Sequence, residues 1–359
     1  MSKYEDPTET LLERSLHNQA VNAPGDDFLL DRVQHRVKAR RNTRAVLAGA
    51  IACGATIAAV AAFIPSLNDP ATPAANGTPL VASEGIPDWR WESYGGIEVQ
   101  VPATWGYGPG VDYPACLIKS KQQPHVARPG IVPAIACPGP VDLRYRADSL
   151  TFGAFGRKAG LQPIDNGWAE ESRVVAGTTV TVFSTDAALR ERILASAQPI
   201  EGTDQQGCAV DHPLTKNPAL RPSATGGLAS IGAAESISVC RYAVRRDSPI
   251  KHPLLASSKL GAEQAAAAVA SIVAAPAGTG PDTPGSCMYK YGEEAVVLTV
   301  RGDAGTQQVY VRYAGCEHNG FDDGATRWKL TKENVPLVLA MPNRPSSATS
   351  AVGELLWPR

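Results

Sequence analysis

One apolar run without any charge stands apart from the mixed pattern of the chain, at residues 45–64. It reads AVLAGAIACGATIAAVAAFI and, as a helix, would have no polar face. At about 1.5 Å of rise per residue, such a helix extends about 30 Å, the thickness of the hydrocarbon core of a bilayer. Six Lys and Arg in residues 32–44 precede it, and positive charge of this kind remains on the cytoplasmic side. The pattern predicts one transmembrane helix at 45–64.

Two alternatives explain this run less well. A core helix of a globular domain would carry a polar face, and this run has none. A cleaved signal peptide begins with a short basic region, whereas 44 residues precede the run here. We therefore expect a cell-membrane protein that crosses the bilayer once, with residues 1–44 in the cytoplasm and the C-terminal region outside the cell.

The cytoplasmic leader, residues 1–44, has two segments with helical spacing of apolar residues, at 8–16 and 26–37. The order of short helix, Asp-capped helix, arginine cluster and alanine-rich span resembles uncharacterised actinobacterial single-pass membrane proteins with an anti-sigma-like layout. The resemblance covers about 65 residues. It implies that residues 1–44 bind a cytoplasmic protein partner such as a sigma factor. The zinc-containing anti-sigma proteins have a His followed by Cys-x-x-Cys, a motif this leader lacks, and a purely topogenic leader is the alternative.

A Pro- and Ala-rich linker is expected at 65–87, followed by about 270 residues that are long enough for two lobes, at 88–204 and 205–359. Abundant Gly and Pro with short β-branched runs predict an α+β fold. From residue 68 onward, 26 Lys and Arg face 28 Asp and Glu, so the surface has no excess of positive charge for nucleic acid.

Alternating apolar residues predict strands in both lobes. Ile97, Val99 and Val101 alternate in one strand, and Val180 and Val182 do so in a hairpin that precedes a helix at 186–197. In the second lobe we expect a strand at 236–244, a helix at 262–275 and a hairpin at 295–313. Five aromatic residues early in the first lobe form either a sugar- or peptide-binding platform or ordinary core packing: Trp89, Trp91, Tyr94, Trp105 and Tyr107.

Six of the seven cysteines follow the predicted membrane span, and the leader has none. This distribution is expected if the region after the span lies in an oxidising compartment, where disulfides form. Six cysteines allow 15 pairings. We favour the sequential pairing because it keeps each bridge within one lobe: Cys116 with Cys137, Cys208 with Cys240, and Cys287 with Cys316. Zinc is disfavoured because no Cys-x-x-Cys occurs.

The densest polar cluster is CEHNGFDDG at residues 316–324. Its oxygen atoms could hold calcium, but Phe321 interrupts the alternation of a calcium loop, and the cluster equally forms a structural turn. The candidate oxygen and nitrogen ligands are Glu317, His318, Asn319, Asp322 and Asp323. No motif for hydrolysis, phosphate binding or a dinucleotide is present, and no cofactor is expected.

These observations predict a membrane-anchored envelope protein without enzymatic activity, whose exported region binds an envelope ligand or partner. The alternative is a membrane-tethered extracytoplasmic hydrolase, for which four histidines are available: His125, His212, His252 and His318. A pocket in which His, Asp and Ser converge would favour the enzyme, and an apolar or aromatic groove would favour binding.

Overall fold

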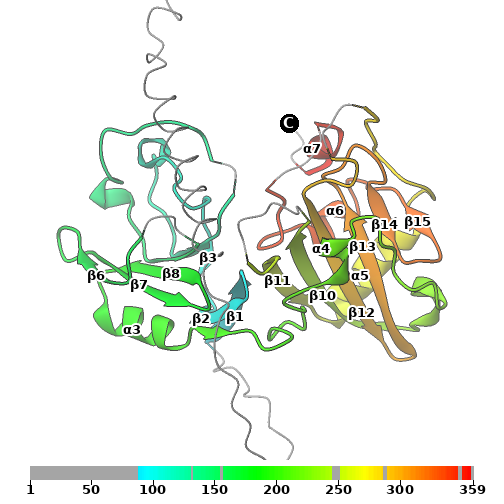
Figure 1. Cartoon of the computed structure of the whole chain (residues 1–359), viewed down its shortest axis with the longest axis horizontal. Helices are drawn as coiled ribbons and strands as arrows, with labels where there is room; N and C mark the ends of the chain where they lie inside the picture. The colour runs from blue at the N-terminus through cyan, green and yellow to red at the C-terminus, as the bar shows by residue number, and fades with distance from the viewer. Residues whose placement is uncertain are drawn as a thin grey trace, which may run out of the picture. The chain divides into compact units, whose positions relative to one another are not determined.

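The computed structural model describes residues 88–130, 132–153, 157–244, 251–285, 289–346 and 350–356, which all belong to one unit of the chain and are drawn in colour in Figure 1. The predicted leader, membrane span and linker, at 1–44, 45–64 and 65–87, lie outside these residues. Within the described part of the chain, no helix is long and apolar enough to cross a bilayer. The fold is α+β, as predicted, and consists mostly of β-sheet.

The smallest sheet has three strands in the order β1-β2-β9, which are β1 (Trp89–Tyr94), β2 (Ile97–Pro102) and β9 (Gln198–Pro199). β1 and β2 form a hairpin whose two-residue turn is Gly95 and Gly96, both with positive φ. Glycine suits this turn because both central residues of a tight hairpin need the left-handed conformation. The alternating Ile97, Val99 and Val101 are all fully buried, in agreement with the sequence pattern.

A six-stranded sheet has the order β3-β4-β5-β8-β7-β6. Its strands are β3 (Gly106–Tyr107), β4 (His125–Ala127), β5 (Ser149–Phe152), β6 (Gly160–Pro163), β7 (Ala169–Val175) and β8 (Thr178–Ser184). β3, β4 and β5 are parallel, and the other neighbours are antiparallel. Leu150, Val180 and Val182 lie on its core face, where helix α3 (Ala187–Ala195) adds Ile193 and Leu194.

The second six-stranded sheet is antiparallel, in the order β11-β10-β12-β13-β14-β15. Its strands are β10 (Ala234–Ala243), β11 (Leu254–Leu260), β12 (Glu294–Gly302), β13 (Gly305–Arg312), β14 (Gly320–Asp322) and β15 (Arg327–Trp328). Helix α5 (Ala262–Val273), yellow in Figure 1, packs Ala265, Ala268 and Ile272 against one face of this sheet. Short helical turns complete the fold: η2 (Ala115–Leu117), η3 (Leu143–Tyr145), α4 (Pro213–Lys216), η4 (Gly227–Ser230), α6 (Val335–Val338) and α7 (Ser350–Leu356).

A β-bulge between β10 and β11 connects two parts of the core. Arg241 pairs with Ala256 but Tyr242 pairs with Leu254, so Leu255 has no partner on β10. Leu255 packs instead in the hydrophobic cluster that includes Leu150 and Val182 of the first six-stranded sheet. Bulges change the direction of side chains and often lie beside functional sites. Here the bulge lies directly at Arg241, a residue of the candidate site described below.

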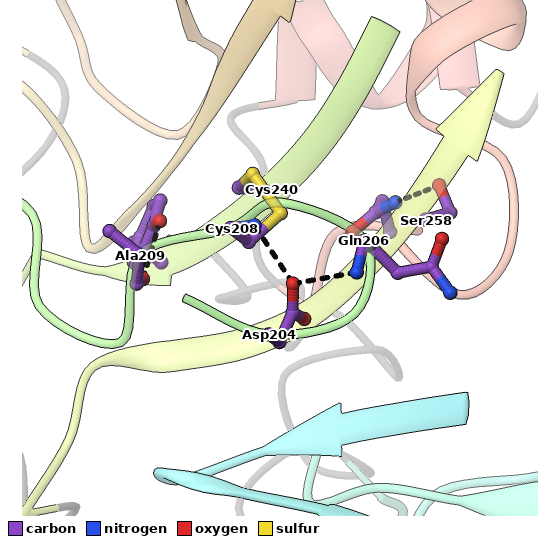
Figure 2. The surroundings of a disulfide bond; sticks show 8 residues. Asp204, Gln206, Cys208, Ala209, Cys240 and Ser258 are labelled. Atoms are coloured by element: carbon purple, nitrogen blue, oxygen red, sulfur yellow. Dashed lines mark hydrogen bonds between the residues drawn. A yellow bond between two sulfur atoms is a disulfide. The ribbon is translucent and has the colours of Figure 1, made fainter. Parts of the chain in front are cut away.

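Two of the three expected disulfides join described residues, Cys116 to Cys137 and Cys208 to Cys240. Cys316 is also disulfide-bonded, and its predicted partner, Cys287, lies outside the described residues. Figure 2 shows the Cys208–Cys240 bridge above Asp204, whose Oδ1 accepts hydrogen bonds from the backbone N–H groups of Gln206 and Cys208. The bridge therefore fixes the segment before α4 to β10 at the residue preceding Arg241.

Candidate functional site

A cleft of about 580 Å³ is lined by three arginines, Arg128, Arg241 and Arg344, and no Asp or Glu is among its described lining residues. Arg128 follows β4, Arg241 lies on β10, and Arg344 belongs to the segment after α6. Other parts of the wall include tyrosine, proline and methionine side chains, among them Tyr107, Tyr113, Pro129, Met341 and Pro342. The cleft thus combines a concentration of positive charge with apolar surface.

Glu92 on β1 holds the Arg128 side of the cleft. Its carboxylate is almost fully buried and accepts hydrogen bonds from Arg128 Nη2 at 2.5 Å and from Arg90 Nε at 2.7 Å. The hydroxyl of Tyr107 donates to the same carboxylate at 2.9 Å. Burial and the negative charge of Glu92 raise the pKa of Tyr107 to about 12, so the hydroxyl keeps its proton. Two guanidinium groups share one carboxylate here, and the cluster retains net positive charge.

Glu294 on β12 holds the Arg241 side. Arg241 Nη1 donates to Glu294 Oε2 at 3.2 Å, and both side chains are buried. Glu294 Oε2 also accepts from the Tyr313 hydroxyl at 3.1 Å and from the backbone N–H of Ser346 at 3.1 Å, and the Ser346 hydroxyl donates to Oε1. These contacts fix both the guanidinium of Arg241 and the segment that carries Arg344.

The buried Tyr94 is affected by the charges of both Arg128 and Arg241. Burial raises the pKa of Tyr94 to about 12, and the charges of Arg241 and Arg128 both act against this rise. Both guanidinium groups therefore act on one phenol, although Arg128 follows β4 of the first six-stranded sheet and Arg241 lies on β10 of the second. Arg128 and Arg241 also line the same cleft, so one ligand can lie beside both charges.

Two guanidinium groups of the cleft have unused donors. Arg241 is 4% exposed, and its buried Nε has no hydrogen-bond partner among the described residues. Arg128 donates through Nε and Nη2, and no hydrogen bond to a described residue uses its Nη1. Because three guanidinium groups line one cleft, an anionic acceptor placed in it would be stabilised by their charge and by charge-assisted hydrogen bonds. The chemistry of the cleft suits a carboxylate or phosphate group.

The 316–324 cluster, the calcium candidate, forms a structural turn. Asp322 binds Arg221 through two hydrogen bonds of 2.8 Å and Arg327 through one of 3.1 Å. Asp323 accepts from the backbone N–H groups of Leu228, Ala325 and Thr326. The carboxylate oxygens are therefore already used by cations and amides of the protein.

The other members of this cluster do not complete a metal site. Asn319 donates to the carbonyls of Pro281 and Gly315, Glu317 pairs with Lys290, and Phe321 is fully buried in the core. The ring of His318 stacks on Tyr291. No group of three or more possible metal ligands occurs among the described residues.

The four histidines do not form a common site. His125 lines a different cavity, and none of the four is among the described lining residues of the arginine cleft. The proline that follows both His212 and His252 is typical of exposed loops, but the structure shows that this interpretation is wrong for His212. His212 is 7% exposed because its Nδ1 caps α4 by accepting the N–H of Leu214 and its ring packs against Tyr242 and Tyr310. His252 is partly exposed near Asp211. The tethered hydrolase remains a prediction.

The early aromatic group serves mainly as packing. Tyr94 and Trp105 are buried in the core, and Trp89 packs on its edge beneath the guanidinium of Arg192. Only Tyr107 of this group lines the arginine cleft. Sequence reasoning missed Arg128, Arg241 and Arg344, because each is isolated in the sequence and no local motif connects it to the others.

The fold and this cleft are the basis for any functional assignment. No family model, no curated protein and no solved structure matches the chain.

Proposed function

We propose that the chain is a membrane-anchored envelope protein whose exported region binds an anionic small molecule in the arginine cleft. The observation that carries the proposal is the convergence of Arg128, Arg241 and Arg344 on one cleft that has no Asp or Glu among its described lining residues. The ligand class is a carboxylate or phosphate attached to an apolar body. Guanidinium groups recognise both anions through paired N–H donors.

The geometry of the cleft favours binding because the arginines are already fixed. Glu92 and Glu294 hold Arg128 and Arg241 through hydrogen bonds, so little side-chain entropy is lost when a ligand arrives. The volume of about 580 Å³ lies within the range of small-molecule sites. Tyr113, Pro129 and Met341 supply apolar surface for the body of the ligand.

The proposed location combines three features of the sequence. Residues 45–64 would form the membrane anchor, and the arginines before them would keep residues 1–44 in the cytoplasm. The disulfides Cys116–Cys137 and Cys208–Cys240 support an oxidising compartment for the rest of the chain. A reporter enzyme that is active only outside the cytoplasm should be active when it is fused to the C-terminus. Activity of a cytoplasm-specific reporter at that end would contradict this topology.

The leader is proposed to recruit a cytoplasmic protein, as its anti-sigma-like layout implies. Residues 1–44 would then connect ligand binding outside the cell to a partner inside. Affinity capture with residues 1–44 as bait should retain one defined protein, and a leader with its apolar positions changed to Ser should not retain it. If both baits retain the same set of proteins, the leader serves only for membrane insertion.

Calorimetric titration tests the anion site. Sodium phosphate and sodium succinate are titrated separately into the full-length chain in detergent micelles, at two salt concentrations. We expect saturable binding of at least one anion, weaker at the higher salt concentration because ions screen the charges. The absence of saturable heat with both anions would contradict the proposal.

Matched variants test whether the heat measured in the titration comes from anion binding in the cleft. The double variant R241Q/E294Q removes both charges of a buried pair together and should weaken binding at least about tenfold, the equivalent of about 1.4 kcal/mol. R344Q changes an exposed arginine of the cleft and should also weaken anion binding. R301Q is the control, because Arg301 is an exposed arginine of β12 outside the cleft. Equal weakening by R301Q would indicate nonspecific attraction.

A further inference from the structure

A second cavity, of about 260 Å³, lies on the face of the first six-stranded sheet that does not carry the core residues. Side chains alternate between the two faces of a strand. Val126, Leu150 and Val182 belong to the core, so their neighbours His125, Ser149 and Phe183 lie on the opposite face. This cavity is separate from the arginine cleft and has no role in the proposed function.

The register of the strands brings these side chains together. His125 pairs with Ser149 across β4 and β5, and Ser149 pairs with Phe183 across β5 and β8. Thr151 and Thr181 form the next row. The cavity floor is therefore a compact patch of one imidazole, hydroxyl groups and one aromatic ring.

The charged residues of this cavity are paired within the protein. Arg146 donates to Asp165 and to the carbonyl of Val141, and Arg157 pairs with Glu170. A charged ligand would have to compete with these pairs, in contrast to the arginine cleft with its unused donors. The cavity therefore favours an uncharged ligand.

Three polar groups in the cavity are free to bind a ligand. No hydrogen bond to a described residue uses the hydroxyls of Ser149 and Thr151, both of which line the cavity. His125 Nδ1 lies 2.8 Å from the carbonyl of Gln123, which holds the proton on Nδ1 and leaves Nε2 as an acceptor. Burial lowers the pKa of His125, which keeps the imidazole neutral. An apolar ligand would leave these groups without partners.

The cover of the cavity is apolar and is held in place covalently. Ile118 and Val141 line it from the segment between β3 and β5, where the disulfide Cys116–Cys137 closes a loop. Ile164 continues the apolar cover, and Phe183 on the floor is stacked on Trp168 at a centroid distance of 4.6 Å. A ligand here meets hydroxyl groups, the imidazole and the Phe183 ring on the floor, and the apolar carbon of Ile118, Val141 and Ile164 in the cover.

We infer that this cavity binds a single neutral sugar ring. A pyranose has C–H groups for Ile118 in the cover and for the Phe183 ring on the floor, and hydroxyls for Ser149, Thr151 and Nε2 of His125 beside that ring. The volume of about 260 Å³ lies just below the range of drug-sized sites and suits one ring with its substituents.

Saturation-transfer NMR on the full-length chain tests the inference, with D-glucose and N-acetyl-D-glucosamine as probes and cyclohexanol as the comparison ring. The micelles are formed from a detergent without a sugar head group, because a maltoside would compete. We expect saturation transfer to at least one sugar, and weaker transfer to cyclohexanol at equal concentration. Equal or stronger binding of cyclohexanol would overturn the sugar assignment, as would no transfer to either sugar.

Two variants locate the binding, and a third serves as control. T151V keeps the shape of the side chain but removes its hydroxyl, and S149A does the same for the neighbouring position. Each should weaken sugar binding about fivefold, as expected for one neutral hydrogen bond. T299V is the matched control, because Thr299 is a partly exposed threonine in the middle of β12. Sugar binding that survives both T151V and S149A unchanged would overturn the inference, and phosphate binding in the arginine cleft should be unaffected by all three.

Discussion

Arg241 and Glu294 form a buried ion pair across two neighbouring strands, with Nη1 3.2 Å from Oε2. Arg241 pairs with Val296 in the register of β10 and β12, and Glu294 pairs with Ala243, so the two side chains are diagonal neighbours on one face. The carboxylate has three further donors, from Tyr313 and Ser346. The pair therefore links the sheet to the segment that carries Arg344.

Removing only one partner of this pair should be costly. R241Q leaves the charge of Glu294 buried without its counterion, and we expect the free energy of unfolding to fall by about 3–5 kcal/mol. The double variant R241Q/E294Q removes both charges and should lose less. Urea denaturation of the two variants measures the difference. A double variant that is less stable than R241Q would contradict the description of Glu294 as an unpaired buried charge in the single variant.

Gly108 and His125 are in such close contact that only glycine fits. A Cβ at Gly108 would overlap Cδ2 and Nε2 of the imidazole, although the backbone there is outside the left-handed region. G108A should force the imidazole to move and lower the free energy of unfolding by about 1–3 kcal/mol, as overpacking does. G139A is the control, since a Cβ at Gly139 meets no atom within 4 Å. Denaturation curves that agree for G108A and the wild type would refute this contact.

The unfolding free energy should depend on pH through His212. Burial lowers the pKa of His212, although a hydrogen bond with Gln308 acts in the opposite direction. The unfolded chain then takes up a proton more readily than the folded chain as the pH falls below about 6.5. Stability is therefore highest above that pH and declines below it, by at most about 1.4 kcal/mol per pH unit for one histidine.

The variant H212N isolates this contribution. Asparagine can still cap α4 through its side-chain oxygen, but it does not titrate. Urea denaturation from about pH 8 to about pH 5 should give a flatter dependence on pH for H212N than for the wild type. Parallel curves for the two proteins would show that His212 titrates alike in both states.

Calcium should have no effect on stability through residues 316–324. The carboxylates of Asp322 and Asp323 are engaged by Arg221, Arg327 and backbone amides, so calcium would have to displace strong contacts. The melting temperature should be the same with calcium and with a chelator. A rise that saturates with calcium and disappears in D323N would contradict the structural role.

The alternation of apolar residues predicted much of the sheet structure. Val180 and Val182 on β8, and Val296, Leu298 and Val300 on β12, are all fully buried. The alternation of Val296, Leu298 and Val300 predicts one apolar face for this strand, but Ala295 and Val297 on the other face are buried as well, against the cluster around Tyr242 and Leu254. Alternation identifies one buried face, and it does not report that other elements cover the second face.

The arginine cleft could not be predicted, because its contacts join residues far apart in the sequence. Glu92 and Arg128 are 36 residues apart, and Arg241 and Glu294 are 53 apart. In the sequence, none of these residues differs from an ordinary charged residue of a strand or loop. The β-bulge at Arg241 also has no local signal, since no glycine marks it. The disulfides were easier to predict, because sequential pairing keeps each bridge local.

The most direct test of the central claim is a crystal structure of the full-length chain soaked in selenate, a tetrahedral oxyanion whose selenium is located by anomalous scattering. If the cleft binds anions, we expect an anomalous selenium peak within hydrogen-bonding distance of Arg241 or Arg128. This peak should be absent from crystals of R241Q/E294Q. Peaks only at exposed arginines such as Arg301, with an empty cleft, would contradict the account.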